Sequence, residues 1–470
     1  MVMGELILDT DIVVLGSGPG GYTAAIHAAD LGLEVVLVES GSRFGGVCLT
    51  EGCIPSKTLI NIVNLKESME NADSMGLKYS GVDVDILQLR QWIDSTVNSL
   101  SNGIAKLLDN RDVEVVKGYG RFIDDHKIYV EGTNTIIRFK HAIIATGSRI
   151  NELPAGMNLP VWTSAIALKL PEVPASLLVI GGGYIGLEIG QAYAGLGSKV
   201  TLVEFSSRLL SGADEDLMQV VLKKCEQQFS AIHTGSKVNT IEKSDAGFLV
   251  TFEKEGKMIR QTFDRVLAAT GRHPNTNDIG LDVLGLSPDE KGLIPTDDQC
   301  RTQKSHIFAV GDVTNGPALA HKAAREGKVA AEVIAGASSA FDNIAVPAVL
   351  FTHPEIAWTG LTEKEAEEKK IPFKKGLFPL TALGRAKSIK KTTGFVKILV
   401  DPETALILGM GIVGEHASEM ISEGNLAIEM GACLEDLIVS IHPHPTFSES
   451  IMEAAEMAAG GSVHVFRKRT

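Results

Sequence analysis

The sequence is poor in cysteine and in long apolar runs, and each of these scarcities excludes a class of protein. Five cysteines in 470 residues are too few for the dense disulfide framework of a small secreted protein. No apolar stretch reaches the roughly 18–20 residues that a membrane-spanning helix needs. The N-terminus lacks a basic start followed by an apolar core and a cleavage site. We therefore expect no membrane span, no signal peptide and a cytoplasmic location.

Basic charge is also in short supply. The chain has 44 Lys and Arg residues against 58 Asp and Glu residues, which gives a net charge of −14. Nucleic acids and anionic membranes are bound by basic faces, so we expect neither as a partner. The length and the hydrophobic content of 44% predict a large globular protein of about three domains.

Two of the five cysteines lie close together. Residues 45–57 read GGVCLTEGCIPSK, with four residues between Cys48 and Cys53. That spacing allows a disulfide if the segment opens a helix. A lone close pair in a cysteine-poor chain indicates redox chemistry, and the alternative is two unpaired core cysteines. We expect the remaining cysteines to be small core residues: Cys225, Cys300 and Cys433.

One sequence pattern occurs twice: a short apolar strand, a glycine-rich turn, a helix and a second strand that ends in Glu. The first copy has GSGPGG at 16–21, and the second has GGGYIG at 181–186. In such motifs the first glycine makes the tight turn, the second lets a pyrophosphate approach the backbone, and the third packs helix against strand. Two copies predict two dinucleotide sites, and the alternative is two structural turns. The motif glycines are Gly16, Gly18 and Gly21, then Gly181, Gly183 and Gly186.

The acidic residue falls 18 positions after the last motif glycine in both copies, at Glu39 and Glu204. A carboxylate at the end of the second strand accepts hydrogen bonds from ribose hydroxyls and repels a 2′-phosphate. Glu204 therefore predicts NAD rather than NADP. Arg208 lies nearby and is the residue type that would bind a 2′-phosphate. Glu204 carries more weight, because it occupies the strand-end position that contacts the ribose hydroxyls.

These motifs, together with ATG at 145–147, VGD at 310–312 and HPHPTFSE at 442–449, resemble the pyridine nucleotide–disulfide oxidoreductases over nearly the whole chain. The resemblance implies an α/β fold of two Rossmann-like dinucleotide-binding domains plus a C-terminal α+β dimerisation domain. It implies four segments: the first part of an FAD-binding domain at 1–150, an NAD-binding domain at 151–275, a return to the FAD domain at 276–345, and the dimerisation domain at 346–470.

Within this family, LAHKA at 319–323 and the C-terminal histidine block imply a particular substrate. It is protein-bound dihydrolipoamide, oxidised to lipoamide while NAD is reduced to NADH. The implied partners are a second copy of the chain and a lipoyl-bearing E2-type protein, or the H-type protein of glycine cleavage. The alternative is another NAD(P)H-dependent reductase of a disulfide or low-molecular-weight thiol. Tyr184 keeps it open, because it resembles the nicotinamide-gating tyrosine of glutathione reductases.

The resemblance also implies roles for the redox residues. Cys53 would be the thiolate beside the flavin, and Cys48 would exchange with the substrate sulfurs. Lys57 would lie by flavin N5, where a positive charge stabilises both the reduced ring and the thiolate. The same resemblance pairs Lys57 with Glu188, and the alternative for Glu188 is a solvated helix residue.

His444 would be the catalytic base, oriented by Glu449. Because these residues lie far along the chain from the cysteines, the resemblance implies that they reach the disulfide of the other subunit. No metal is expected. Beyond the two motifs, the implied cofactor contacts are Lys57, Gly120, Ser148, Asp312 and Ala320 for FAD, and Val238 and Gly271 for NAD.

Overall fold

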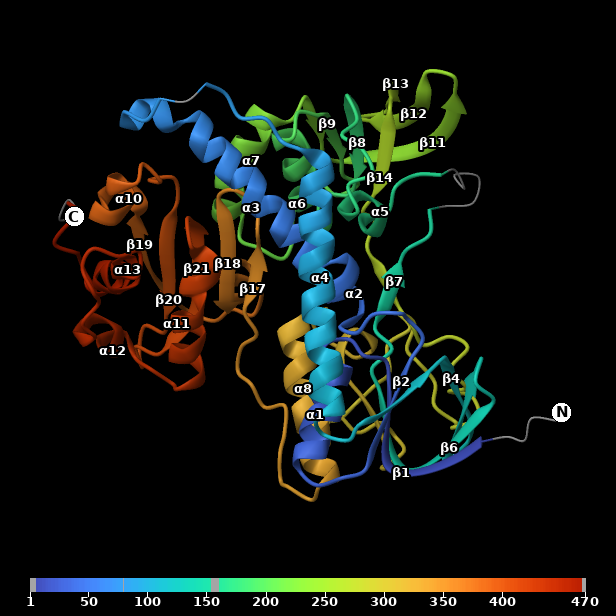
Figure 1. The fold of residues 1–470 in the computed structure, drawn as a ribbon. Coiled ribbons are helices and arrows are strands. Elements are labelled where there is room, and N and C mark those ends of the chain that lie inside the picture. The colour runs from blue at the N-terminus through green and yellow to red at the C-terminus, as the bar shows by residue number, and fades with distance from the viewer. Residues whose placement is uncertain (1–5, 79, 154–159, 467–470) are drawn as a thin grey trace.

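The computed structural model describes residues 6–78, 80–153 and 160–466 (Figure 1). The N-terminal segment in which the sequence predicts no signal peptide begins with five residues that lie outside this part of the chain. Within it, no helix combines the length and the apolar character needed to cross a membrane. Figure 1 shows the two dinucleotide-binding units on one side and the C-terminal part on the other, with a long helix running between them.

The first unit is built on a seven-stranded sheet. Its strands are β1 (Leu6–Leu15), β2 (Val35–Glu39), β3 (Glu114–Lys117), β4 (Tyr119–Asp124), β5 (Lys127–Glu131), β6 (Thr135–Ile144) and β16 (Ile307–Ala309). The order is β3-β2-β1-β6-β5-β4, and β16 also pairs with β6. The chain therefore returns to this sheet after the second unit. Ile12 and Val14 of β1 enter the core beneath the helices, whereas Val13 and Leu15 enter a second core on the other face.

Helices cover one face of this sheet and connect it to the rest. They are α1 (Pro19–Asp30), α2 (Gly46–Glu51), α3 (Cys53–Glu70), α4 (Ile86–Asp109) and α8 (Ala320–Ile334). The first begins at Pro19, because proline suits the first turn of a helix. Strand β6 ends at Ile144. Gly147 turns the chain with a φ of +69°, and Ser148 opens the short strand β7 (Ser148–Ile150).

The second unit repeats the arrangement. Strands β8 (Ser176–Ile180), β9 (Lys199–Val203), β10 (Ala231–His233) and β14 (Arg265–Ala268) form a parallel sheet in the order β10-β9-β8-β14. Its helices are α5 (Ser164–Leu168), α6 (Tyr184–Gly195) and α7 (Glu215–Gln228). An antiparallel sheet of β11 (Ser236–Ser244), β12 (Gly247–Lys254) and β13 (Lys257–Phe263) lies beside it, and β15 (Arg272–Pro274) pairs with β7.

The C-terminal part is an antiparallel sheet with helices against it. The strands lie in the order β17 (Ala348–Leu350), β18 (Glu355–Gly360), β21 (Ile407–Gly414), β20 (Phe395–Val400) and β19 (Lys374–Pro379). The helices are α9 (Glu363–Glu368), α10 (Gly384–Ser388), α11 (Ala417–Glu429), α12 (Leu434–Val439) and α13 (Glu449–Ala459). Cys225 and Cys300 are buried as expected, but Cys433 is only half-buried, because it caps the start of α12.

A buried lysine ties the second unit to the C-terminal sheet. The side chain of Lys397, on β20, is 2% exposed. Its Nζ lies 2.8 Å from Asp214 Oδ2, 2.6 Å from Asp216 Oδ1 and 2.7 Å from Glu363 Oε1. Burial acts to lower the pKa of Lys397, but the hydrogen bonds to the three carboxylates outweigh it and raise the pKa. Three carboxylates this close would suit a cation, and the ammonium group supplies that charge.

We expect Lys397→Met to lower the free energy of unfolding by about 3–5 kcal/mol, because it leaves three carboxylates together without a counter-charge. Lys375→Met is the matched control. Lys375 also pairs with Glu363, at 2.8 Å, but its side chain is 39% exposed, so its loss costs about 1 kcal/mol or less. Urea denaturation of both variants measures the difference. Equal midpoints for the two variants would contradict the prediction.

Candidate functional site

The two close cysteines meet at the junction of two helices. Cys48 lies on α2, Cys53 begins α3, and their Sγ atoms are 2.7 Å apart. Gly46 explains how this segment reaches the first glycine motif. Its φ is +59°, and a Cβ atom there would lie 2.7 Å from the Cα of Gly18. Only glycine permits this approach, so the sulfur pair is held beside the start of α1.

The two thiols differ in acidity. The hydrogen bond from Cys48 lowers the pKa of Cys53 to about 7; burial opposes this shift and the charge of Lys57 reinforces it. The same hydrogen bond, together with burial, raises the pKa of Cys48 far above its ordinary range. Cys53 is therefore the sulfur that carries the negative charge, and Cys48 keeps its proton. A thiolate is the reactive form of cysteine, so the site is prepared for sulfur chemistry.

Lys57 and Glu188 form an ion pair between the two units. The Lys57 Nζ lies 2.8 Å from Glu188 Oε2, and the Glu188 side chain is only 7% exposed. Ser56 Oγ donates to the same oxygen at 2.8 Å, and the backbone N–H of Phe351 donates to Oε1 at 3.1 Å. The Lys57 ammonium also lies 4.5 Å from the centre of the Phe351 ring. Glu188 is thus a buried partner of Lys57, not a solvated helix residue.

Sequence reasoning missed Ser56 and Phe351. Ser56 directly precedes Lys57 in the sequence, and this adjacency is the signal that could have indicated it; the structure buries it on the first turns of α3. Phe351 lies in the C-terminal part, and no local pattern connects it with Lys57. Phe351 is the first residue after β17, and its N–H contacts Glu188 on α6.

The first glycine motif is shaped to receive a phosphate. A Cβ at Gly21 would lie 1.9 Å from the carbonyl oxygen of Gly16, so the third glycine allows α1 to pack tightly. Gly18 is the N-cap of α1, has no side-chain cap, and has open space where a Cβ would stand. Glu39 closes the turn, since its carboxylate accepts from the N–H of Ser17 at 2.9 Å. Free helix N–H groups beside open space fit a pyrophosphate, and this site therefore suits FAD.

The second motif has the same construction. A Cβ at Gly186 would lie 1.9 Å from the carbonyl oxygen of Gly181, and Gly183 caps α6 with open space where its Cβ would stand. Glu204 accepts from the N–H of Gly182 at 2.6 Å. Arg208, the residue that argued for a phosphate, instead pairs with an acidic neighbour on α7 at 3.6 Å. These features fit NAD at the second site.

The structure brings some of the remaining predicted cofactor contacts together and places the others on separate elements. Ser148 Oγ donates to Asp312 Oδ2 at 2.5 Å, and Arg272 Nε donates to Ser148 Oγ at 2.7 Å. Arg272, which sequence reasoning missed, joins the second unit to this contact. Gly120 lies inside β4, where a Cβ would be 2.7 Å from a side-chain carbon of Leu15.

The other three predicted cofactor contacts lie on separate elements. Ala320 is the first residue of α8, whose N-cap also lacks a side-chain cap. Gly271 lies between β14 and β15 with a φ of +99°. Val238 lies on β11 and packs partly against the core of the second unit. Of these three residues, only Ala320 lies at a helix start that brings free N–H groups towards the first motif.

His444 and Glu449 form a pair at the start of α13. The His444 Nδ1 lies 2.8 Å from Glu449 Oε1, and the N–H of Thr446 donates to Oε2 at 2.7 Å. Burial acts to raise the pKa of Glu449, but these hydrogen bonds outweigh it and hold the pKa below its ordinary value. The His444 side chain is 77% exposed. Figure 1 shows α13, at whose start this pair lies, well apart from α2.

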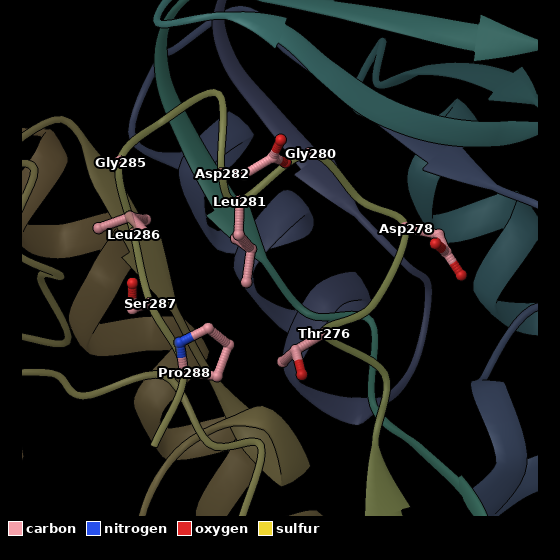
Figure 2. A pocket seen from close by; sticks show the side chains of 9 residues that line it. All are labelled: Thr276, Asp278, Gly280, Leu281, Asp282, Gly285, Leu286, Ser287 and Pro288. Carbon is pink, nitrogen blue, oxygen red and sulfur yellow. The ribbon is translucent and has the colours of Figure 1, made fainter. Parts of the chain in front are cut away.

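A cavity of about 530 Å³ lies elsewhere, along the segment from Thr276 to Pro288 (Figure 2). Its titratable lining groups are Asp278 and Asp282, and no predicted site residue lines it. Figure 2 shows these two carboxylates pointing in different directions from separate parts of the loop. No cysteine, lysine or histidine lines this cavity, so it has no part in the chemistry of the sulfur pair.

Comparisons with known proteins agree with this geometry. Residues 10–327 match the family described as pyridine nucleotide-disulphide oxidoreductase, and residues 346–455 match its dimerisation domain. Dihydrolipoyl dehydrogenase of Geobacillus stearothermophilus is 44% identical over 100% of both chains. The Bacillus subtilis protein of the same name is 43% identical over 99% of this chain and 100% of its own.

Solved structures agree as well. LpdA from Mycobacterium tuberculosis superposes with a TM-score of 0.88 at 27% identity, covering 95% of this chain and 99% of that chain. The HOCl-induced flavoprotein disulfide reductase RclA from Escherichia coli reaches 0.85 at 27% identity, covering 96% and 99%. The α/β fold class predicted from the sequence is confirmed.

Proposed function

The chain belongs to the pyridine nucleotide-disulphide oxidoreductase family, and on that premise we propose that it oxidises the dihydrolipoyl group of a carrier protein to the lipoyl disulfide. It is an oxidoreductase that uses FAD and NAD, and it forms a homodimer through its C-terminal domain. The observation that carries the proposal is the sulfur pair, in which Cys53, with a pKa of about 7, lies beside Lys57.

The reaction at the sulfurs is a disulfide exchange. A thiolate of the substrate attacks Cys48 of the oxidised pair, the Cys48–Cys53 bond breaks, and Cys53 leaves as a thiolate. The second substrate thiol then attacks the mixed disulfide, which releases the lipoyl disulfide and the Cys48 thiol. The hydrogen bond from Cys48 is absent at this step, since Cys48 has no S–H in a disulfide, but the charge of Lys57 also lowers the pKa of Cys53 and makes it the better leaving group. This supports the assignment of Cys48 as the exchanging sulfur.

The substrate dithiol must lose protons as it becomes a disulfide, so the site needs a base. A histidine with its Nδ1 held by a carboxylate presents Nε2 as the proton acceptor, and His444 with Glu449 has this arrangement. The exposure of His444 supports its reaching a sulfur pair outside its own chain. Lys57 is held in place by its ion pair with Glu188 and by the ring of Phe351, and Ser56 holds Glu188.

We assign the first glycine motif, with Glu39, Lys57, Asp312 and Ala320, to FAD. The second motif and Glu204 are assigned to NAD. When bound, FAD accepts two electrons from the reduced sulfur pair and passes them to NAD⁺. The chain's own part is to orient both dinucleotides on helix N-termini and to hold the Lys57 charge next to the thiolate.

A steady-state assay tests this proposal. Dihydrolipoamide and reduced glutathione are each offered with NAD⁺ and with NADP⁺, and dihydrolipoamide with NAD⁺ should give by far the highest kcat/KM. The rival is a glutathione-type reductase, and the observation that favours it is Tyr184, whose ring stacks on Trp358 with centres 6.1 Å apart. Faster turnover of glutathione, or of NADPH with oxidised glutathione, would establish the rival and overturn the proposal.

Glu204 should decide the choice of nucleotide. A carboxylate about 4 Å from a 2′-phosphate costs roughly 4 kcal/mol at an effective dielectric constant of 20, or about a thousandfold in affinity. Glu204→Gln keeps the acceptor for the Gly182 N–H but removes the charge. We expect this variant to bind NADP⁺ much better while its affinity for NAD⁺ changes little, as measured by calorimetry. An unchanged preference would show that Glu204 does not read the ribose.

We further propose that the natural substrate is carried on a lipoyl-bearing protein, of the E2 type or of the glycine-cleavage H type, and that the enzyme works in the cytoplasm. The half-exposed position of Cys48 supports access by a lipoyl arm. The likeness to dihydrolipoyl dehydrogenases over the full length of the chain supports the same partner class. Purified lipoylated domain and its unlipoylated form, compared as substrates, test the assignment.

A further inference from the structure

A second buried ion pair lies next to the FAD motif. Lys322 and Glu326, one turn apart on α8, are joined by a contact of 2.7 Å from Nζ to Oε1, and their side chains are 4% and 7% exposed. Removing two charges from water is costly, and an apolar pair of similar volume is often as stable or more stable. Stability alone therefore does not account for this pair.

The pair holds both ends of one short turn. Glu326 Oε2 accepts from the backbone N–H of Gly311 at 2.7 Å, and Lys322 Nζ donates to Thr314 Oγ1 at 3.0 Å. Thr314 Oγ1 in turn donates to the carbonyl oxygen of Gly311 at 2.8 Å. Between these anchors lies Asp312, the residue assigned to FAD.

The helix that carries the pair is itself held against the glycine motif. A Cβ at Gly327 would lie 2.4 Å from the carbonyl oxygen of Gly20, and a Cβ at Gly20 would lie 3.1 Å from the carbonyl oxygen of Ala323. Helices α8 and α1 therefore touch through their backbones at the residues that directly follow Lys322 and Glu326. The ion pair thus connects the Asp312 turn to the same rigid element that supports the phosphate-binding turn.

We propose that Lys322 and Glu326 are positioning residues that hold the Gly311–Asp312 turn in its FAD-binding geometry before the cofactor arrives. This inference rests on the proposed function, because Asp312 is assigned to FAD there. A turn ordered in advance loses less conformational freedom when the cofactor binds, so affinity rises without any new contact to the cofactor.

Two double variants separate positioning from stability. Lys322→Met with Glu326→Leu fills the space with apolar groups but leaves the Gly311 N–H without an acceptor. Lys322→Met with Glu326→Gln is also neutral, but its amide oxygen still accepts from that N–H. Lys328→Met, on the exposed side of α8, is the matched control for the lysine change. The readouts are the Kd of the apoprotein for FAD, from quenching of flavin fluorescence, and the melting temperature of each apoprotein.

We expect the leucine double variant to bind FAD about tenfold to a hundredfold more weakly than wild type, because the turn loses both anchors and must be ordered when the cofactor binds. The glutamine double variant keeps the acceptor for the Gly311 N–H but loses the Lys322 bond to Thr314, so its affinity should lie between those of the leucine double variant and the wild type. Lys328→Met should bind as wild type, and the apoproteins of the two double variants should melt at similar temperatures. Equal FAD affinity for both double variants would overturn the inference.

Thr314→Val provides a second test should the leucine variant not fold. It removes only the hydroxyl that links Lys322 to Gly311, and it should weaken FAD binding about tenfold. Unchanged affinity in this variant would also overturn the inference. Failure of the proposed function has a different signature, because the steady-state assay would then show turnover of another thiol substrate while the wild-type apoprotein still binds FAD.

Discussion

Cys53→Ser should abolish both turnover and the long-wavelength absorbance that a thiolate gives beside bound oxidised FAD. Serine forms no disulfide and stays protonated at neutral pH, so we expect kcat to fall by roughly 10⁴-fold or more. Cys48→Ser should lose turnover to the same extent but keep the absorbance, because Cys53 is the sulfur whose pKa is lowered, to about 7, by the hydrogen bond from residue 48 and by Lys57. A serine hydroxyl still donates that hydrogen bond.

A pH titration of Cys48→Ser checks the assignment. Only the thiolate gives the absorbance, so the band should be present above the pKa of Cys53 and should fade as the pH drops through about 7. Cys433→Ser is the control, since this half-buried cysteine lies in the C-terminal domain and should leave activity unchanged. Normal turnover in either Cys48→Ser or Cys53→Ser would refute the sulfur mechanism.

Mixing two inactive variants should restore activity if His444 serves the partner subunit. His444→Ala alone should cost about 10²–10⁴-fold, which is typical of a general base. When this variant and Cys48→Ser exchange subunits, each mixed dimer has one site with both Cys48 and His444 intact. With random exchange half of the dimers are mixed, so activity should return to about one quarter of wild type.

The control for this experiment mixes Cys48→Ser with Cys53→Ser. The two sulfurs are 2.7 Å apart within one chain, so every site of every mixed dimer lacks one of them, and no activity should return. Exchange itself is followed with a mass-tagged subunit. Proven exchange between the His444→Ala and Cys48→Ser variants without recovery would show that His444 acts on its own chain.

Several features of this protein could be predicted from local sequence patterns. The two glycine motifs and their acidic residues could be predicted because each depends on a turn, a helix start and a strand end close together in the chain. The structure repeats the same close contact in both copies, with a Cβ at Gly21 or Gly186 only 1.9 Å from the first glycine's carbonyl oxygen. The cysteine pair could be predicted equally well, because the two residues are only five positions apart in the chain.

Contacts between distant segments could not be read in this way. The Phe351 N–H on Glu188, the three carboxylates around Lys397 and the Arg272 contact to Ser148 each join different parts of the chain. Their residue types are ordinary, and nothing in the neighbouring sequence distinguishes them. They arise because the sheets and helices pack in one arrangement, and burial then requires every charge to find a partner.

The sequence by itself determined the chemistry that this chain can hold: a sulfur pair, two dinucleotide turns, a lysine and a histidine. The family resemblance named Cys53 as the thiolate, but only the tertiary structure supplied the physical reason, because the pKa of Cys53 depends on the hydrogen bond from Cys48 and the charge of Lys57. It also decided that His444 is exposed and that α13 lies away from α2. Both outcomes depend on distances between side chains in space, and those distances are set by packing rather than by spacing along the chain.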